Sequence, residues 1–241
     1  RRDIVGFYAW QNNLSLPQDF YKIVKELAQV GRIGKNTSVQ DIRSSFLEEV
    51  LLVYEDCLKD SKQAKDYLRG RGFSELGIQL NRIGYAPNSS TLRIYGLSSS
   101  KLEENELLSG EHEYFSNRII FPIYDLRGNL VHMTGRYLGE IPLNIDGGEK
   151  YPRYKDTKPH LNSNIKNYLI FENKIKSYST HKPLIVTEGF PDSLSLDELG
   201  IQVVGVLGLE KIVSLFKNNT ELEVRLQAVC SILSWGAVPH P

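Results

Sequence analysis

The pattern of apolar positions predicts helices in the first third of the chain. Apolar residues recur at helical spacing over 46–58, which predicts one helix, and a second helix is expected over 61–68, before the stretch RGRG ends it. The apolar positions of the first helix are Phe46, Val50, Leu51, Tyr54 and Leu58. A shorter helical pattern covers 21–30, and a glycine-containing loop is expected at 31–41.

Shorter elements are predicted in the middle of the chain. Residues 74–88 indicate a short helix that runs into a strand, and residues 101–110 another short helix with Gly110 at its C-cap. Two β-rich runs within 115–139 flank the sequence DLRGN, whose Asp, Gly and Asn favour a tight reversal. A β-hairpin is therefore predicted there.

A βαβ pattern follows in the last third. Residues 151–167 predict an irregular basic loop, and 167–173 a short strand or the start of a helix. Residues 184–187 then form a short apolar strand of the buried type, 192–199 a short helix, and 201–207 a returning strand. A strand, helix and strand this close together predict a right-handed unit with a parallel strand pair.

Composition indicates a globular protein and narrows its chemistry. The 241 residues are 41% hydrophobic, enough for a sizeable core, and 29 basic residues balance 29 acidic ones, so nucleic-acid binding would depend on local charge clusters. The cysteines Cys57 and Cys230 and the five scattered histidines predict no zinc site in this chain. No apolar run reaches the length of a membrane span, and the cytoplasm is the expected compartment.

Two carboxylates mark the predicted βαβ unit as a candidate site. The carboxyl ends of parallel strands carry the binding site in such sheets. Glu188 follows the first strand, Gly189 lets the chain turn, and Asp192 lies at the helix start. Paired carboxylates of this kind suit Mg²⁺ or Mn²⁺. The alternative is that Asp192 caps the helix and Glu188 is a solvated loop residue.

Several motifs together resemble one protein family. The stretch TEGFPDSLSLDELGIQVVGVLG resembles the first motif of the Toprim domain, which bacterial-type primases, topoisomerases and some nucleases share. Upstream, YLRGRGFSELGIQLNRIGYAP, FSNRIIFPIYDLRGNLVHMTGRYLG and KY occur in the same order as in the catalytic core of bacterial DnaG-type DNA primases. Topoisomerases and nucleases of the Toprim class lack that upstream block. Over 67–208 the chain is therefore similar to a DnaG-type primase.

This resemblance implies a fold, a domain division and an activity. It implies an α/β chain in which a mixed α+β primase core subdomain precedes a partial Toprim domain with a parallel βαβ unit. The expected divisions are 1–45, an N-terminal extension of unknown role, 46–180, the core subdomain, and 181–241, the partial Toprim domain with an atypical tail. The implied activity is DNA-dependent synthesis of short RNA primers by metal-assisted nucleotidyl transfer. The implied partners are single-stranded DNA, ribonucleoside triphosphates and, in the full-length family, a replicative helicase.

The resemblance also assigns roles to individual residues. It implies that Glu188 and Asp192 are catalytic and bind the metal ion, Mg²⁺ or Mn²⁺. The basic and aromatic positions that match the family's nucleic-acid and nucleotide groove are Arg118, Arg136, Lys150 and Tyr151. Arginine offers a planar fork for phosphate oxygens, lysine a mobile point charge, and tyrosine a face on which a base can stack.

Each of these residues also has a purely structural interpretation. Arg118 and Arg136 can instead pair with carboxylates such as Asp125 at the edges of the hairpin. The remaining alternatives concern neighbouring basic and aromatic residues. Lys150, Arg153 and Lys155 can form a solvated loop. Tyr151 and Tyr154 can stack on bases or be packing residues. Arg69 or Arg71 can contact phosphate, or both can be exposed arginines at a helix end.

The chain departs from the family pattern near its end. The Toprim fold completes its site with a downstream Asp-x-Asp pair, whereas no aspartate follows Asp197 and the residues from 220 to 241 do not resemble the family. A site without those ligands is expected to hold metal poorly, and the chain is expected to be a primase core cut off inside its Toprim domain. The alternatives are a non-catalytic single-stranded nucleic-acid-binding module and another Toprim enzyme, a nuclease or topoisomerase.

Overall fold

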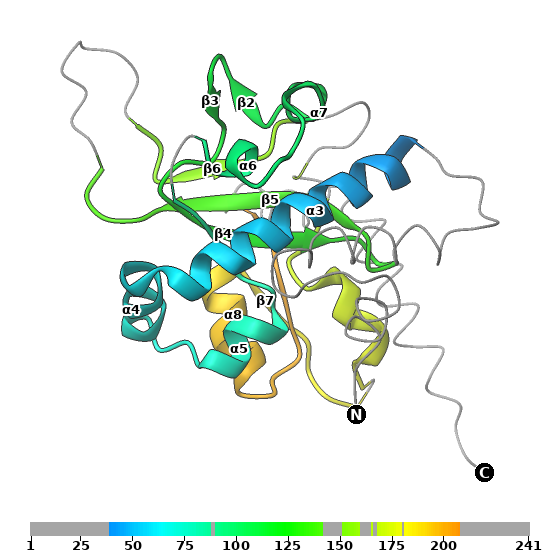
Figure 1. Cartoon of the computed structure of the whole chain (residues 1–241). Coiled ribbons are helices and arrows are strands. Elements are labelled where there is room, and N and C mark those ends of the chain that lie inside the picture. Colours follow the sequence, from blue (N-terminus) through cyan, green and yellow to red (C-terminus); the bar gives the residue numbers. More distant parts are fainter. Residues whose placement is uncertain are drawn as a thin grey trace, which may run out of the picture.

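A four-stranded antiparallel sheet forms the centre of the computed structural model (Figure 1). The strands are β1 (Gly84–Ala86), β4 (Arg118–Tyr124), β5 (Leu130–Tyr137) and β6 (Tyr154–Asp156), in the order β1-β4-β5-β6. The predicted hairpin is confirmed as β4 and β5. The Asp125 carboxylate stabilises the tight turn between them, because its Oδ1 accepts hydrogen bonds from two backbone N–H groups of the turn.

The structure describes residues 39–87, 90–141, 151–159, 165, 168–179 and 181–207. The helix predicted at 21–30, residue Lys150 and the tail after 207 lie outside the described residues. Within the described ranges, no helix combines the length and the apolar character that a membrane crossing requires.

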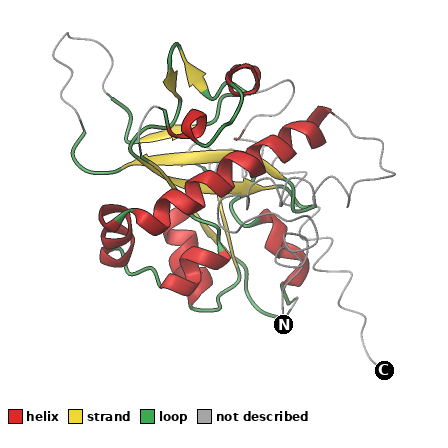
Figure 2. Cartoon of the chain, viewed as in Figure 1, coloured by secondary structure: helices red, strands yellow, loops and turns green. Residues whose placement is uncertain are grey.

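Helices lie on both sides of this sheet (Figures 1 and 2). α3 (Val39–Asp60) crosses one face, and α4 (Lys62–Gly70) follows it after Ser61, whose Oγ accepts a hydrogen bond from the first turn of α4. Both predicted helices are confirmed, but α3 begins inside the expected loop. No glycine or proline interrupts the sequence between Val39 and Asp60, so the helix extends back to the end of the glycine-containing stretch.

Short elements connect the helices to the sheet. They are α5 (Glu75–Leu80), α6 (Thr91–Ile94), α7 (Ser99–Glu104), β2 (Leu108–Ser109) and β3 (His112–Glu113). The predicted sequence of α5 and then β1 is confirmed, whereas the prediction for Gly110 is wrong. Gly110 has a φ of +63° in the turn of the β2–β3 hairpin and does not cap a helix. α7 ends earlier, where Glu106 already takes the left-handed conformation with a φ of 56°.

The predicted βαβ unit is confirmed. β7 (Ile185–Thr187) and β8 (Val203–Gly205) are parallel, and α8 (Phe190–Glu198) connects them. Before this unit, Ile170 forms a bridge to β8 and η2 (Glu172–Ser177) is a 3₁₀ helix.

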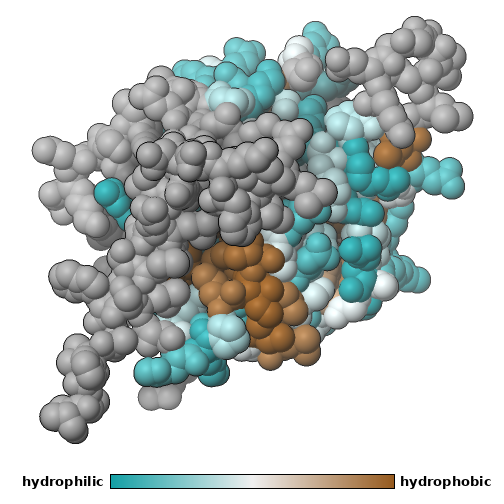
Figure 3. All heavy atoms as spheres, turned by 180° about the vertical axis from the view of Figure 1, so that it is seen from behind, coloured by the Kyte–Doolittle hydropathy of each residue, from teal (hydrophilic) through white to brown (hydrophobic). Residues whose placement is uncertain are grey.

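β7 is less buried than its sequence predicts. Ile185 and Val186 are 37% and 43% exposed, because β7 pairs with β8 alone among the described residues and forms the edge of the small sheet. Figure 3 shows, from behind, apolar residues gathered in one area that is bordered by grey atoms. The fully buried strand expected at 184–187 is therefore an edge strand in the described part of the chain.

The core has two main parts, one on each side of the central sheet. Ile120, Leu130 and Met133 contact a cluster built from α3, α6 and α7. Ile119 and Phe121 contact the other cluster, which includes residues of α4, α8 and β8. The strict alternation of side chains along β4 therefore separates an α3 side of the sheet from an α8 side.

Gly84 in β1 lies too close to α3 to carry a side chain. A Cβ there would lie 2.7 Å from the Tyr54 Cβ and 3.0 Å from the Tyr54 carbonyl carbon. The carbonyl carbon belongs to the α3 backbone and the Cβ is bonded directly to that backbone, so neither atom can rotate away. We expect Gly84→Ala to lower the free energy of unfolding by about 1–3 kcal/mol in a urea titration.

Gly70, at the end of α4, is the matched control for that substitution. A Cβ at Gly70 meets nothing within 4 Å, so Gly70→Ala should leave the stability unchanged or raise it by up to about 1 kcal/mol through helix propensity. Equal stability of the two variants would contradict the close approach of β1 to α3.

Candidate functional site

Arg136 lies on the α8 side of the central sheet. In the register of β4 and β5, Phe121 pairs with Thr134, and Arg136 lies two residues further along β5, so all three point to the same side. Phe121 stacks on Phe190, the first residue of α8, with ring centroids 4.6 Å apart. The βαβ unit and Arg136 therefore share one face of the sheet.

Two tyrosine rings lie against the Arg136 guanidinium. Its Cζ is 4.5 Å from the ring centroid of Tyr67 and 5.9 Å from that of Tyr154. Tyr67 comes from α4, and Tyr154 comes from β6, where it pairs with Arg136 across the ladder. Cation–π contacts at exposed sites contribute about 0.5–1 kcal/mol each. These contacts orient the half-buried guanidinium without a carboxylate.

Two further arginines lie near the same tyrosine. Burial raises the pKa of Tyr67, and the positive charges of Arg136, Arg71 and Arg153 oppose that rise. Among the described residues, no carboxylate forms an ion pair with any of these three arginines. We call Tyr67, Arg71, Arg136, Arg153 and Tyr154 the arginine–tyrosine cluster. Within the described ranges, the positive charge of this cluster lies beside aromatic faces and is not paired with a carboxylate.

The two arginines of the RGRG stretch differ in their partners. Arg69 forms ion pairs with Asp66, at 3.6 Å, and with Glu75, so its charge is locally balanced. Arg71 follows α4, is exposed and has no such pair among the described residues. Only Arg71 of the two adds positive charge to the arginine–tyrosine cluster.

Arg118 lies on the other side of the sheet and is completely buried. Its Nη1 donates hydrogen bonds to the carbonyl oxygens of Gly135 and Arg153, at 2.9 and 3.0 Å, and its Nη2 donates to the carbonyl oxygen of Pro152 at 2.9 Å. This differs from the phosphate contact predicted for Arg118, because a guanidinium without exposed surface cannot reach a solvent-borne phosphate. Arg118 instead holds the start of β6 against β5.

Tyr151 packs beside Arg118. The Arg118 Cζ is 5.2 Å from the Tyr151 ring and 5.4 Å from the Tyr137 ring, and the two rings meet edge to face at 5.2 Å. Tyr151 is 36% exposed, so part of its ring remains accessible. The structure thus gives Tyr151 a packing contact and leaves its predicted base contact untested, while Lys150 lies outside the described residues.

The alternative in which hairpin carboxylates neutralise the arginines is not observed. The Asp125 carboxylate accepts hydrogen bonds within its own turn, from Arg127, Asn129 and the Asn129 side chain. It forms no ion pair with Arg118 or Arg136 in the described part of the chain.

The basic residues around β6 divide between the two sides of the sheet. Lys155 pairs with Gly135, on the Arg118 side, and its Nζ donates to the Tyr114 carbonyl oxygen at 3.0 Å while lying 3.7 Å from the Tyr114 ring centroid. Burial, then the nearby charge of Arg118, lowers the pKa of Lys155. Lys155 is therefore a packed residue, unlike the solvated residue that its loop position predicts.

Glu188 and Asp192 lie at the carboxyl end of β7. Both side chains are exposed, and Gly189 between them is the N-cap residue of α8. Asp192 lies in the first helical turn, and its Oδ2 is 3.9 Å from the position that a Cβ on Gly189 would take. Among the residues that the structure describes, no side-chain hydrogen bond caps α8, so Asp192 is not seen in the capping role that was its structural alternative.

These two carboxylates fit a metal ion that also binds phosphate. The described residues contain no group of three or more Asp, Glu, His or Cys side chains that would hold a metal by themselves. Mg²⁺ commonly binds through one or two carboxylates and completes its shell with water and substrate phosphates. Glu188 and Asp192 match that donor set.

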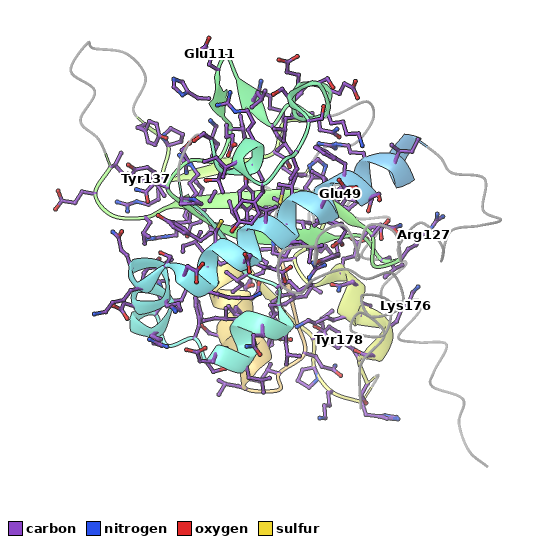
Figure 4. The ribbon with its side chains drawn as sticks, in the orientation of Figure 1. Glu49, Glu111, Arg127, Tyr137, Lys176 and Tyr178 are labelled. Atoms are coloured by element: carbon purple, nitrogen blue, oxygen red, sulfur yellow. The ribbon has the colours of Figure 1, made fainter. Side chains whose placement is uncertain are left out.

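Sequence reasoning missed part of the arginine–tyrosine cluster. The sequence predicts a phosphate contact for Arg136, a stacking role for Tyr154 and a phosphate contact for Arg69 or Arg71, but no local pattern singles out Tyr67. Tyr67 and Arg71 approach Arg136 because α4 packs beside the open end of the β4–β5 hairpin, away from the hairpin turn. Figure 4 shows this arrangement, with Tyr137 near that end and Arg127 at the turn. The local signal for a site here was the stretch YLRGRG, which places basic residues and a tyrosine at the end of a predicted helix.

This fold and this site define an α/β protein whose central sheet carries a cluster of arginines beside tyrosine rings. In sequence, the family model for the DNA primase catalytic core, N-terminal domain, matches residues 53–174, about half of the chain. The DNA primase of Thermotoga maritima is 33% identical over 221 residues, which cover 86% of this chain and 37% of that protein.

Solved structures agree with the sequence match. The Aquifex aeolicus primase, comprising zinc-binding and RNA polymerase domains, has a TM-score of 0.63 at 26% identity and covers 86% of this chain and 52% of that one. A DnaG primase catalytic domain bound to single-stranded DNA shares the fold, with a TM-score of 0.56 at 24% identity over 69% of this chain and 54% of that one.

The chain belongs to the family of DNA primase catalytic cores. The resemblance to bacterial DnaG-type primases, inferred from the order of motifs, is thereby confirmed. The chain spans about a third of the length of the curated relatives it matches and about half of the solved chains.

Proposed function

We propose that this chain is the catalytic core fragment of a DnaG-type primase, which binds single-stranded DNA and ribonucleoside triphosphates and makes short RNA primers by metal-assisted nucleotidyl transfer. Membership of the primase family supports this proposal, as does the related catalytic domain solved with single-stranded DNA. The observation that carries it is the arginine–tyrosine cluster, because unpaired arginines beside tyrosine faces suit a chain of phosphates and bases.

Each part of the site has a proposed role. Arg71, Arg136 and Arg153 bind phosphate oxygens, for which the guanidinium offers parallel donors. The exposed face of Tyr154, which is 45% accessible, stacks on a base. Arg118 acts indirectly, by holding the carbonyl groups that precede Tyr154. Tyr151, and Lys150 outside the described residues, remain proposed nucleic-acid contacts.

The carboxylates have a separate role. Glu188 and Asp192 would hold Mg²⁺ or Mn²⁺ together with the phosphates of the nucleotide. The bound ion supplies neutralisation of the charge that develops as a 3′-hydroxyl attacks the α-phosphate. The location of both residues at the exposed carboxyl end of β7 supports this assignment.

The remaining expectations follow from the same family. The βαβ unit is proposed to be the beginning of a Toprim domain over 181–241, preceded by the core subdomain over 46–180 and the N-terminal extension over 1–45. The cytoplasm is the proposed compartment, and a replicative helicase is the proposed partner of a full-length relative.

A second candidate function is a nucleic-acid-binding module without metal chemistry. The arginine–tyrosine cluster would serve this function unchanged, since it includes no carboxylate.

Primer synthesis on a single-stranded template separates the two functions. The purified chain is incubated with an oligonucleotide, labelled ribonucleotides and Mg²⁺ or Mn²⁺, and products are resolved on a denaturing gel. We expect short RNA products that disappear in Glu188→Gln, while the affinity for the oligonucleotide, measured by fluorescence anisotropy, is unchanged in that variant. Binding without products would favour the module, and the absence of both would contradict the primase proposal.

A further inference from the structure

The end of α8 that lies far from Asp192 carries two acidic residues in an unfavourable position. Asp197 and Glu198 are the last residues before the C-cap of this nine-residue helix. Carbonyl groups concentrate negative potential at a helix C-terminus, so acidic side chains there oppose the helix dipole. Their placement therefore depends on partners outside α8.

Glu198 finds its partner at the start of α5. Its Oε1 accepts hydrogen bonds from the backbone N–H and the Oγ of Ser74, both at 3.0 Å, and Ser74 is the N-cap residue of α5. One turn later, Gly77 leaves room for the carboxylate, because a Cβ at Gly77 would overlap Glu198. Glu198 thus lies where positive potential from α5 favours it.

Asp197 joins the same end of α8 to η2. Its Oδ2 accepts a hydrogen bond from Lys174 Nζ at 2.6 Å and from Asn81 Nδ2 at 3.3 Å. Lys174 also donates to Asn81 Oδ1 at 2.7 Å, which closes a triangle of three partly or fully buried side chains. Asn81 and Lys174 are more than 90 positions apart in the sequence, and both are held at the C-terminal end of α8.

The opposite end of α8 is held by the apolar contacts of Phe190 and by a hydrogen bond between the hydroxyl groups of Ser193 and Thr187, which are 2.6 Å apart. Phe190 stacks on Phe121 of β4 and meets Phe171 edge to face, with ring centroids 4.6 and 5.3 Å apart. An apolar contact is non-directional, whereas the hydrogen bonds of Asp197 and Glu198 are directional. The directional contacts of Asp197 and Glu198 therefore fix the C-terminal end of α8 on η2 and α5.

We propose that Asp197 and Glu198 form an acidic clamp that positions the carboxylate site. By fixing α8 on α5 and η2, the clamp sets where Glu188 and Asp192 lie relative to Arg136. The clamp residues are positioning residues, remote from the reacting groups. The inference deepens the proposed function and rests on it for its catalytic consequence, while its structural part stands independently.

The structural part is tested by a distance between two spin labels. Nitroxides are attached to cysteines at Ser195 and Glu103, both exposed, in a chain with Cys57 and Cys230 replaced by serine. We expect one narrow distance distribution for the unaltered clamp, and a broader or displaced one for Asp197→Asn with Glu198→Gln. Gly77→Ala should have the same effect through steric displacement of Glu198.

Two controls separate the clamp from general loss of structure. Glu111→Gln removes an exposed charge from the β2–β3 turn and should leave the distribution unchanged. Lys174→Asp combined with Asp197→Lys reverses the ion pair and should restore the narrow distribution that Lys174→Asp alone loses. A distribution that stays narrow in both clamp variants overturns the inference. If the double variant does not fold, Asp197→Asn and Glu198→Gln are measured singly under the same criterion.

The catalytic part is tested by measuring kcat for primer synthesis and the affinity for single-stranded DNA separately. Small displacements of catalytic groups reduce rates by about tenfold or more, so kcat for primer synthesis should fall by about that factor in the clamp variants. Their affinity for single-stranded DNA should stay unchanged, since the arginine–tyrosine cluster does not contain the clamp. Unchanged kcat despite a broadened distribution overturns the positioning role. If the unaltered chain makes no primers, the proposed function fails, and the distance measurement still decides whether the clamp orients α8.

Discussion

Replacing Arg136 with alanine is expected to weaken the binding of single-stranded DNA by about 10- to 100-fold. A hydrogen bond to a charged group contributes about 1.5–3 kcal/mol, and each 1.4 kcal/mol is a tenfold change in affinity. Arg136 is half-buried between elements, is oriented by the rings of Tyr67 and Tyr154, and has no described carboxylate to neutralise it. Its loss removes both a phosphate donor and the centre of the cluster.

The measurement is a fluorescence-anisotropy titration of a labelled oligonucleotide at several salt concentrations. The slope of log affinity against log salt should decrease by roughly one unit in Arg136→Ala if one phosphate contact is lost. Arg136→Lys should recover only part of the affinity, because lysine lacks the planar fork. Arg127→Ala is the control, since Arg127 is exposed at the opposite end of the hairpin (Figure 4). Equal losses for Arg136→Ala and Arg127→Ala would refute a specific role for the cluster.

Replacing Arg118 with methionine is expected to lower the free energy of unfolding by about 3–5 kcal/mol. Three carbonyl oxygens, those of Gly135, Pro152 and Arg153, receive hydrogen bonds from this one guanidinium. Each buried polar group left without a partner costs about 1–3 kcal/mol, and methionine fills much of the volume without offering a donor. The expected loss is therefore that of a buried hydrogen-bond network, with little change in packing.

Urea-induced unfolding followed by circular dichroism measures this change, with Arg127→Met as the exposed control. Arg118→Lys should recover a fraction of the loss, since one ammonium cannot reach all three carbonyl oxygens in the geometry of the fork. If Arg118→Met is as stable as the control but loses oligonucleotide affinity, Arg118 is a ligand contact, as its sequence position predicts. If it is unstable and the folded fraction binds normally, the supporting role is correct.

Local patterns were sufficient for the elements that short stretches of sequence define. The β4–β5 hairpin follows from Asp125 and Gly128 between two β-rich runs, and Gly128 has the positive φ of 85° that such a turn requires. The βαβ unit follows from two short apolar runs separated by a helical one. In both cases the residues that determine the element are neighbours in sequence.

Elements that depend on distant partners were not predictable in this way. β6 consists of Tyr154, Lys155 and Asp156, which have little β propensity as a group and pair because β5 offers an open edge. The side of the sheet to which Arg118 points follows from the register and not from its neighbours. Successive residues of β4 point to opposite sides of the sheet. Arg118 therefore points to the side opposite that of its neighbour Ile119, which pairs with Arg136.

The site residues that could be predicted are those whose position depends on the neighbouring sequence. Glu188 and Asp192 lie where the strand end predicts, and Arg136 lies beside the aromatic and basic groups that a groove requires. Tyr67 belongs to α4, more than 60 residues earlier than Arg136, so only the packing of α4 reveals it.

The two rings beside Arg136 also affect the entropy of binding. A guanidinium that already rests on aromatic faces has given up much of its rotamer freedom before any ligand arrives, so a phosphate need not immobilise it. Neither the ring faces nor the guanidinium discriminates among bases. In the proposed function, this preorganised surface would therefore bind single strands of different base sequence about equally well.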